Sequence, residues 1–220
     1  MRHELLEFAD DDTVADAAAL FVASLARRRI DEVGRFRFAV SGGRTPRKMF
    51  EKLATLDVAW EEVELYQVDE RIVPVRDAAR NLTNLRASLG SARPVLKPMP
   101  VEDDDLEAGA DHYAASLPDH FDLVHLGLGT DGHTASLLPD DPVLDVRNRL
   151  VALTDAYQGH RRMTLTYLAL ARADQILWLV TGPDKRAALS RLRDGDTSIP
   201  AGRVEAAQSL IMADRVALRS

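Results

Sequence analysis

The alternation of short apolar runs with longer amphipathic runs is the feature that most constrains the fold of this 220-residue chain. These patterns predict strands at 5–8, 35–40, 63–68, 122–128, 175–180 and 209–213, and helices at 11–33, 47–56, 81–89, 106–117, 166–173 and 183–193. Strands separated by helices are typical of a mostly parallel sheet with helices on both faces. We therefore predict an α/β, Rossmann-like fold in which residues 1–220 form a single domain.

Charge and composition narrow the possible partners. The chain has 28 basic and 35 acidic residues, a net charge of −7, which argues against a nucleic-acid-binding protein. It has no cysteine, which excludes disulfides, thiolate nucleophiles and cysteine–zinc sites. The run 17–26 is too short for a membrane span, and Glu4 and Glu7 are unlike a signal peptide. We expect a soluble, cytoplasmic protein with no membrane or nucleic-acid partner, as a monomer or weak oligomer.

Unusual residues follow several of the predicted strands, and ligands of open parallel sheets bind beyond the carboxyl ends of the strands. The first such segment is Ser41–Pro46. Gly42 and Gly43 allow a tight turn and a close backbone approach to a ligand. Thr45 is expected to cap the next helix, with Pro46 at its first position, and the exposed amides there would attract an anion. A plain strand-to-helix turn is the equally weighted alternative.

Two further strand ends carry cations. Thr181–Lys185 follows strand 175–180, and Lys185 lies in the first turn of the next predicted helix. A cation is mildly unfavourable there, and a bound phosphate would reverse the penalty. Asp69, Glu70 and Arg71 follow strand 63–68, and the guanidinium of Arg71 suits bidentate phosphate recognition. A solvated lysine and a solvated turn are the alternatives.

The segment Gly127–His133 matches the G-x-G-x-x-G dinucleotide pattern after a strand. We reject a dinucleotide site because Pro139 stops any helix within two turns. What remains is a glycine loop that presents Asp131 and His133. A carboxylate two residues from a histidine can orient the imidazole, as in acyl-transfer sites. A surface histidine is the less favoured alternative.

Taken together, these motifs resemble the 6-phosphogluconolactonase family. The matching stretches run in the family's order and cover most of the chain: 41–46, DERIVP at 69–74, 81–85, GLGTDGHTASLLP at 127–139, RMTLT at 162–166, and 181–185. The resemblance implies an α/β fold of the sugar-phosphate isomerase/lactonase type. It implies hydrolysis of 6-phospho-D-glucono-1,5-lactone to 6-phospho-D-gluconate in the pentose phosphate pathway, without a metal or an organic cofactor.

The resemblance also implies roles for individual residues. The catalytic histidine of the family falls on His133, with Asp131 as its partner, and phosphate-binding residues fall on Arg71 and Lys185. The full set of substrate-binding candidates is Gly42, Gly43, Arg44, Thr45, Asp69, Arg71, Gly129, Arg162 and Lys185.

The chain departs from the family pattern at three places. Arg44 stands where a small serine is usual, and either contacts phosphate or points to solvent. The segment before Arg162 reads Gly159-His160-Arg161, without the expected prolines. His125 lies within a strand where apolar residues are commoner, and no catalytic role is assigned to it.

The implied mechanism needs no covalent nucleophile, because a lactone carbonyl is electrophilic enough for direct attack by water. His133 would take a proton from that water and return it to the leaving ring oxygen. Amides of 129–132 or Arg162 would stabilise the oxyanion. Two alternatives stay open: a glucosamine-6-phosphate deaminase, whose family carries a glutamate after the DGH motif where this chain reads TASLLP, and a non-catalytic sugar-phosphate-binding protein.

Overall fold

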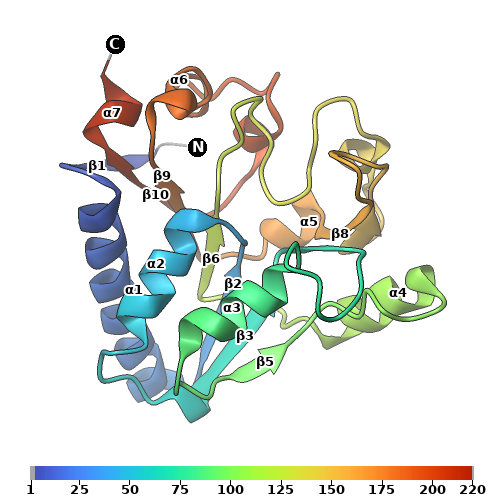
Figure 1. Cartoon of the computed structure of the whole chain (residues 1–220), viewed down its shortest axis with the longest axis horizontal. Helices are drawn as coiled ribbons and strands as arrows, with labels where there is room; N and C mark the ends of the chain where they lie inside the picture. The colour runs from blue at the N-terminus through green and yellow to red at the C-terminus, as the bar shows by residue number, and fades with distance from the viewer. Residues whose placement is uncertain (1–2, 220) are drawn as a thin grey trace.

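A seven-stranded sheet runs through the centre of the computed structural model, which describes residues 3–219 (Figure 1). All neighbouring strands in this sheet pair in parallel. The prediction of a mostly parallel α/β sheet is therefore confirmed. In spatial order the strands are β1 (Glu4–Phe8), β10 (Gln208–Asp214), β9 (Gln175–Val180), β6 (Leu123–Leu126), β2 (Phe36–Val40), β3 (Val63–Gln67) and β5 (Val95–Lys97).

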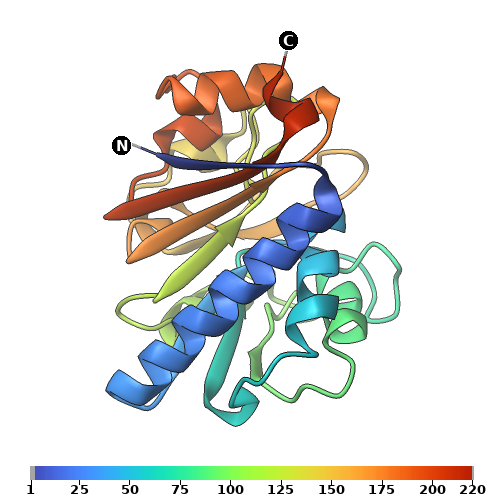
Figure 2. The same ribbon diagram turned by 90° about the vertical axis from the view of Figure 1, so that its left-hand side faces the viewer.

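Helices cover both faces of the sheet, and α1 crosses one face as a long diagonal (Figure 2). Strand β9 shows how the two cores are divided, because successive side chains of a strand point to opposite faces. Leu177 and Leu179 pack in the core beneath α1–α3, while Ile176, Trp178 and Val180 pack in the core beneath α4–α7. The helices are α1 (Asp11–Val33), α2 (Arg44–Leu53), α3 (Asn81–Leu89), α4 (Leu106–Ser116), α5 (Tyr167–Leu170), α6 (Arg186–Arg193) and α7 (Arg215–Leu218).

A second, three-stranded antiparallel sheet was not predicted. It consists of β4 (Asp69–Arg71), β8 (Arg162–Leu165) and β7 (Val151–Leu153), with β8 in the centre. Two of these strands have only three residues, too few for a periodic pattern to be recognised. The predicted helix 166–173 is shorter in the structure, because α5 ends at Leu170, the next two residues form a turn, and Ala173 pairs with Phe121 in an isolated bridge.

The structure confirms the predicted start of α1 and corrects that of α2. The cap of α1 is Asp10, whose carboxylate accepts a hydrogen bond from the amide of Thr13. Helix α2 begins at Arg44, three residues earlier than predicted, with Gly43 as its N-cap and without a side-chain cap. Thr45 therefore lies inside the first turn and is not the cap.

The strand order creates a crevice beside the centre of the sheet. From β2 the chain continues to β3 and β5 on one side, whereas β6 begins the half of the sheet that continues to β9 and β10. The connections at the carboxyl ends of β2 and β6 therefore diverge, and such a switch point is where open α/β sheets bind ligands. Within residues 3–219, no helix is long and apolar enough to span a membrane.

Candidate active site

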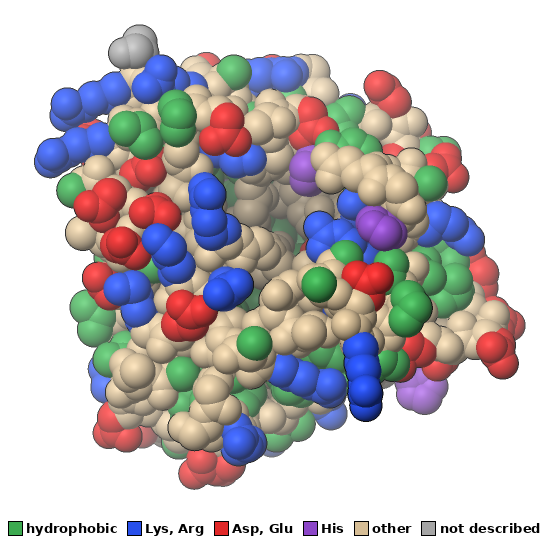
Figure 3. All heavy atoms as spheres, in the orientation of Figure 1, with side chains coloured by type: hydrophobic (Ala, Val, Ile, Leu, Met, Phe, Trp, Pro, Cys, Tyr) green, Lys and Arg blue, Asp and Glu red, His purple; other side chains and the backbone are tan. Residues whose placement is uncertain are grey.

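A pocket of about 900 Å³ lies over the carboxyl ends of β2, β6 and β9. On the surface it is a hollow with Lys and Arg side chains gathered around it (Figure 3). The structure brings His133 and every predicted binding residue to this pocket, although they come from distant parts of the chain: Gly42, Gly43, Arg44, Thr45, Asp69, Arg71, Gly129, Arg162 and Lys185. Asp131 is not part of the lining but contacts His133.

The loop after β6 folds back on itself to present His133. The amide of Gly129 donates to the carbonyl of His133 at 2.8 Å. Nδ1 of His133 lies 2.6 Å from Oδ1 of Asp131. Glycine is required at 129, because a Cβ there would collide with Nδ1 of His133 and Oδ1 of Asp131. Burial acts to raise the pKa of Asp131, but hydrogen bonds and the charge of His133 lower it overall, so its carboxylate stays ionised.

Tyr157, which was not among the predicted site residues, completes this cluster. Its hydroxyl donates to Oδ2 of Asp131 at 3.2 Å. Its ring meets the imidazole of His133 edge-on, with 5.8 Å between centroids, and lies 5.1 Å from the guanidinium carbon of Arg162. The only feature of the sequence that could have indicated a role for Tyr157 is its position, five residues before Arg162 in the segment that departs from the family pattern.

Two guanidinium groups occupy neighbouring strands of the small sheet. Arg71 in β4 pairs with Arg162 in β8. Arg71 donates to the carbonyl of Ala79 at 2.6 Å and to Asn81 at 3.2 Å. Burial, and then the charge of Arg71, lower the pKa of Arg162. Among the described residues neither guanidinium forms an ion pair with a carboxylate, so a bound anion would compensate their charge.

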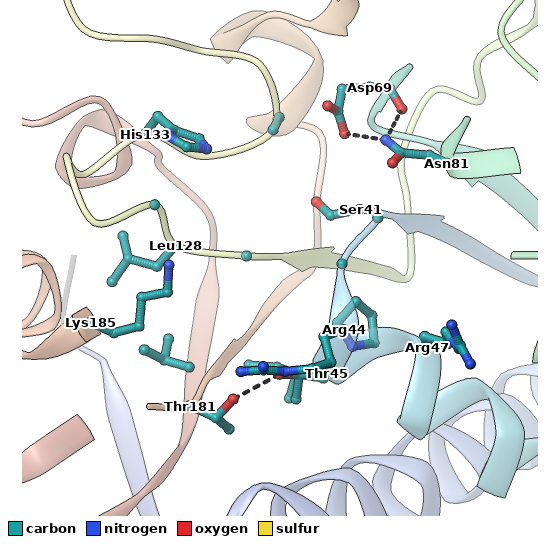
Figure 4. A pocket seen from close by; sticks show the side chains of 18 of the residues that line it. Ser41, Arg44, Thr45, Arg47, Asp69, Asn81, Leu128, His133, Thr181 and Lys185 are labelled. Carbon is teal, nitrogen blue, oxygen red and sulfur yellow. Dashed lines mark hydrogen bonds between the residues drawn. The ribbon is translucent and has the colours of Figure 1, made fainter. Parts of the chain in front are cut away.

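Asp69 is a buried carboxyl at the opposite side of the pocket from His133 (Figure 4). It accepts a hydrogen bond from Oγ of Ser136 at 2.7 Å and a longer one from Asn81. Burial raises its pKa, the hydrogen bond from Ser136 opposes this, and the charge of Glu70 raises it further. The neutral form of Asp69 therefore persists to a higher pH than for a solvated aspartate.

Glu70 is not part of a solvated turn, the alternative considered for this segment, because its side chain is fully buried. Its carboxylate accepts hydrogen bonds of 2.8 Å from the amides of Arg71, Asn81 and Leu82 and from the side chain of Gln67. These bonds satisfy amides at the start of α3 and join them to β4. Glu70 thereby fixes the backbone from which Arg71 and Asn81 reach the pocket.

The loop after β2 lies between two cationic groups. A Cβ on Gly42 would collide with the side chain of Asn81, which also accepts from Arg71. On the other side, Oγ1 of Thr45 lies 2.8 Å from Oγ1 of Thr181, as the dashed line in Figure 4 shows. That contact joins the loop to the segment carrying Lys185. The loop amides are thus flanked by Arg71 and by Lys185.

Two other cations border the pocket with different surroundings. Arg44 is exposed, lines the pocket and has no ion pair among the described residues. Lys185 is partly buried, and its Nζ lies 3.4 Å from Oδ2 of Asp184. Both are at the amino ends of helical segments, where backbone amides also attract anions.

A group with metal-ligand chemistry lies at the other end of the sheet. Ligand atoms of His120, Asp122 and Asp174 lie within 4.8 Å of one another. Asp122 already accepts hydrogen bonds of 2.7 Å from Arg29 and from the amide of Arg37. This group is therefore part of an ion-pair cluster at the amino ends of β6 and β9, away from the pocket.

Comparison with known proteins identifies the family. Residues 9–212 match the family model described as glucosamine-6-phosphate isomerases/6-phosphogluconolactonase. The chain belongs to this family. A 6-phosphogluconolactonase from Caulobacter vibrioides is 33% identical over 208 residues, which cover 88% of this chain and 87% of the relative. One from Mesorhizobium japonicum is 36% identical over 195 residues, covering 82% and 81%.

Other relatives of the family are much longer than this chain. The human GDH/6PGL endoplasmic bifunctional protein is 37% identical over 185 residues, which cover 75% of this chain but only 23% of that protein. The rabbit protein of the same name is likewise matched over 24% of its length. This chain therefore spans about a quarter of these two relatives.

Solved structures of family members have the same fold. A 6-phosphogluconolactonase from Thermotoga maritima superposes with a TM-score of 0.88 at 26% identity, covering 97% of this chain and 100% of that one. One from Shewanella baltica gives 0.87 at 27% identity, with coverage of 97% and 98%. A monomeric glucosamine-6-phosphate deaminase gives 0.85 at 17% identity, with 97% and 98% coverage. The fold alone therefore does not separate the two reactions.

Proposed function

We propose that this chain, as a single domain of residues 1–220, is a 6-phosphogluconolactonase. It hydrolyses 6-phospho-D-glucono-1,5-lactone to 6-phospho-D-gluconate, the lactonase step of the pentose phosphate pathway, with no metal and no organic cofactor. The observation that carries the proposal is the presence of the His133–Asp131 pair in one pocket with the cations Arg71, Arg162 and Lys185. We further propose that it acts in the cytoplasm as a monomer or weak oligomer.

His133 acts as the general base in this proposal. Because Nδ1 contacts the ionised carboxylate of Asp131, Nδ1 carries the proton and Nε2 is the basic atom. Nε2 takes a proton from water as the oxygen of that water attacks the lactone carbonyl. The imidazolium then gives the proton to the ring oxygen when the C–O bond breaks, which leaves a carboxylic acid and a free hydroxyl. The acid loses its remaining proton to solvent and becomes the carboxylate.

Arg162 is the donor that the geometry favours for the oxyanion. The amide of Gly129 donates to His133, and the amide of Gly132 donates to the carbonyl of Gly129, so both are used inside the loop. The guanidinium of Arg162 lines the pocket beside Tyr157 and has no carboxylate partner among the described residues. A fixed positive group near the developing negative oxygen lowers the barrier to attack.

The phosphate binds at the loop of residues 42–45, between Arg71 and Lys185. The contacts of Gly42 with Asn81 and of Thr45 with Thr181 hold this loop between the two cations. Arg44 adds a further positive charge at the rim. Binding energy from the phosphate then serves to orient the lactone carbon toward His133.

The test is a coupled assay with freshly prepared 6-phosphogluconolactone, comparing the wild-type protein with His133→Ala. We expect kcat to fall by about 10²–10⁴-fold, the usual contribution of a positioned base, while the dissociation constant for 6-phosphogluconate changes little. Equal losses in turnover and product binding would make His133 a binding residue. Ammonia release from glucosamine 6-phosphate by the wild-type protein, without lactonase activity, would establish the deaminase instead.

A further inference from the structure

The hairpin between β7 and β8 is a rigid support at the edge of the pocket. Tyr157 and His160 exchange backbone hydrogen bonds of 3.0 and 3.2 Å. Gln158 and Gly159 between them have positive φ values of 51° and 82°, which are the signs required at both central positions of a type I′ turn. Two-residue turns of this type hold their flanking residues in a defined register. Tyr157 is therefore placed by the backbone of the hairpin.

The side chain of Tyr157 contacts both members of the His133–Asp131 pair. The two oxygens of Asp131 are divided: Oδ1 faces Nδ1 of His133 at 2.6 Å, and Oδ2 accepts from the hydroxyl of Tyr157 at 3.2 Å. Burial, and then the charge of Asp131, raise the pKa of Tyr157, so its phenol stays protonated and remains a donor. With both oxygens held, the carboxylate has no freedom to rotate away from the imidazole.

The same side chain supports Arg162 on its other side. The guanidinium carbon lies 5.1 Å from the centroid of the Tyr157 ring, within the range of a cation–π contact. Nη1 of Arg162 also donates to the carbonyls of Tyr157 and His160, at 2.7 and 3.2 Å. One aromatic side chain thus lies between the proposed general base and the proposed oxyanion donor.

We propose that Tyr157 is a positioning residue that holds the Asp131–His133 pair and Arg162 in a single catalytic arrangement. The proposal rests on the lactonase function proposed above, and it assigns a task to a hairpin that departs from the family pattern. The hydroxyl controls the dyad through Asp131, and the ring controls Arg162. The two effects are separable by substitution, because phenylalanine keeps the aromatic ring without the hydroxyl, and leucine has neither the ring nor the hydroxyl.

Tyr157→Phe isolates the hydroxyl. We expect kcat to fall about 3- to 10-fold, as for loss of one hydrogen bond, with KM changed less than about 2-fold, since phosphate contacts are intact. Without the hydrogen bond from the phenol, the carboxylate of Asp131 stabilises the imidazolium form of His133 more strongly. The acid limb of the kcat profile should therefore move to higher pH. A purely structural role would lower the amount of folded enzyme and leave this limb in place.

Tyr157→Leu removes the ring as well, so Arg162 loses its cation–π contact and is held only by the backbone carbonyls of residues 157 and 160. We expect kcat to fall at least about tenfold further than in Tyr157→Phe, because oxyanion donors typically contribute 10²–10³. Tyr167→Phe is the matched control. The Tyr167 hydroxyl donates to the carbonyl of Pro200 at 2.9 Å, and the residue does not line the pocket. This variant should leave kcat and the pH profile unchanged.

A readout that needs no turnover separates this proposal from the lactonase assignment. The titration of the His133 imidazole, followed by NMR and assigned with His133→Gln, should shift to higher pH in Tyr157→Phe and stay unchanged in Tyr167→Phe. An active wild-type enzyme whose kcat profile and His133 titration are both unaffected by Tyr157→Phe would overturn the positioning role. A shifted titration in a protein without lactonase activity would support the dyad geometry and reject the proposed function.

Discussion

Two ionisable residues of the pocket, Asp69 and Arg162, are buried, and neighbouring groups do not fully compensate the cost of their charges. Burial raises the pKa of Asp69 and lowers the pKa of Arg162, so each is driven toward its neutral form. Such opposing shifts in one pocket are typical of functional sites, where a ligand completes the electrostatic balance. In the proposed reaction, the negative charge of the phosphate and of the forming carboxylate compensates Arg162, and it favours the neutral form of Asp69.

Asp69 gives a prediction at this scale. The pKa of Asp69 is raised in the folded state above its ordinary value of 3.8. Between these two pKa values the native protein binds more protons than the unfolded chain. The free energy of unfolding therefore falls as the pH rises through this range. Asp69→Asn removes this penalty. We expect a higher Tm than wild type at pH 7 in calorimetry, and each 1 kcal/mol gained corresponds to about 2–4 °C.

The difference in Tm between Asp69→Asn and wild type should narrow as the pH falls toward 3.8, because Asp69 is protonated in both states below that pH. Substitution of the exposed Asp119 by Asn serves as the control and should change Tm little at either pH. A Tm below wild type at pH 7, by an amount that does not vary with pH, would contradict the assigned direction for Asp69.

At the scale of elements, strand β6 contains a buried histidine, His125, among apolar residues. His125 pairs with Val40 in β2 and Leu177 in β9 and is fully buried. Its Nδ1 accepts a long hydrogen bond of 3.4 Å from the amide of Ser41, and its Nε2 has no hydrogen-bond partner within residues 3–219. Burial lowers the pKa of His125 to about 3. The strand therefore excludes a proton that the unfolded chain would bind.

This exclusion predicts acid sensitivity. The unfolded histidine titrates near 6.5 and the folded one near 3, so unfolding free energy falls as pH decreases between these values. The slope for one proton is about 1.4 kcal/mol per pH unit. His125→Leu should reduce the slope between pH 4 and 6 by most of that amount, measured by urea unfolding. Substitution of the exposed His112 by Gln is the control, and equal slopes in His125→Leu and wild type would contradict the prediction.

At the scale of the whole molecule, the pocket joins two halves of the sheet. Its walls come from the β2–α2 loop and β4 on one side and from the β6 loop and the segment after β9 on the other. The side-chain hydrogen bonds that join the two sides include Thr45–Thr181 and Ser136–Asp69. A ligand that binds cations on both sides adds a connection present only in the folded state.

The product should therefore stabilise the whole fold. At a concentration 100 times its dissociation constant, 6-phosphogluconate should add about 2.7 kcal/mol, which corresponds to a rise in Tm of about 5–10 °C for a chain of this size. Gluconate, which lacks the phosphate, should give a much smaller shift at the same concentration. Equal shifts from both compounds would show that phosphate recognition is not what holds the ligand.

The order of elements and the positions of the chemical motifs were determined by the sequence alone. Apolar periodicity is local, so it identified α1 with its bounds, the long strands and the parallel sheet. Once the sheet is parallel, all its strands end at one edge, so the glycine loops with His133 and Lys185 were expected to converge. The spacing of Asp131 and His133 is equally local, and their hydrogen bond follows from it.

Only the tertiary structure decided which side chains complete that site. In the sequence Glu70 has the pattern of a surface carboxylate, whereas in the structure backbone amides at the start of α3 donate hydrogen bonds to it. Arg71 meets Arg162, and Tyr157 meets Asp131, through a small antiparallel sheet whose strands are too short to be recognised from periodicity. The physical reason is that periodicity reports which face of an element is buried, whereas contacts between distant segments depend on strand register and turn geometry that form only when the chain packs.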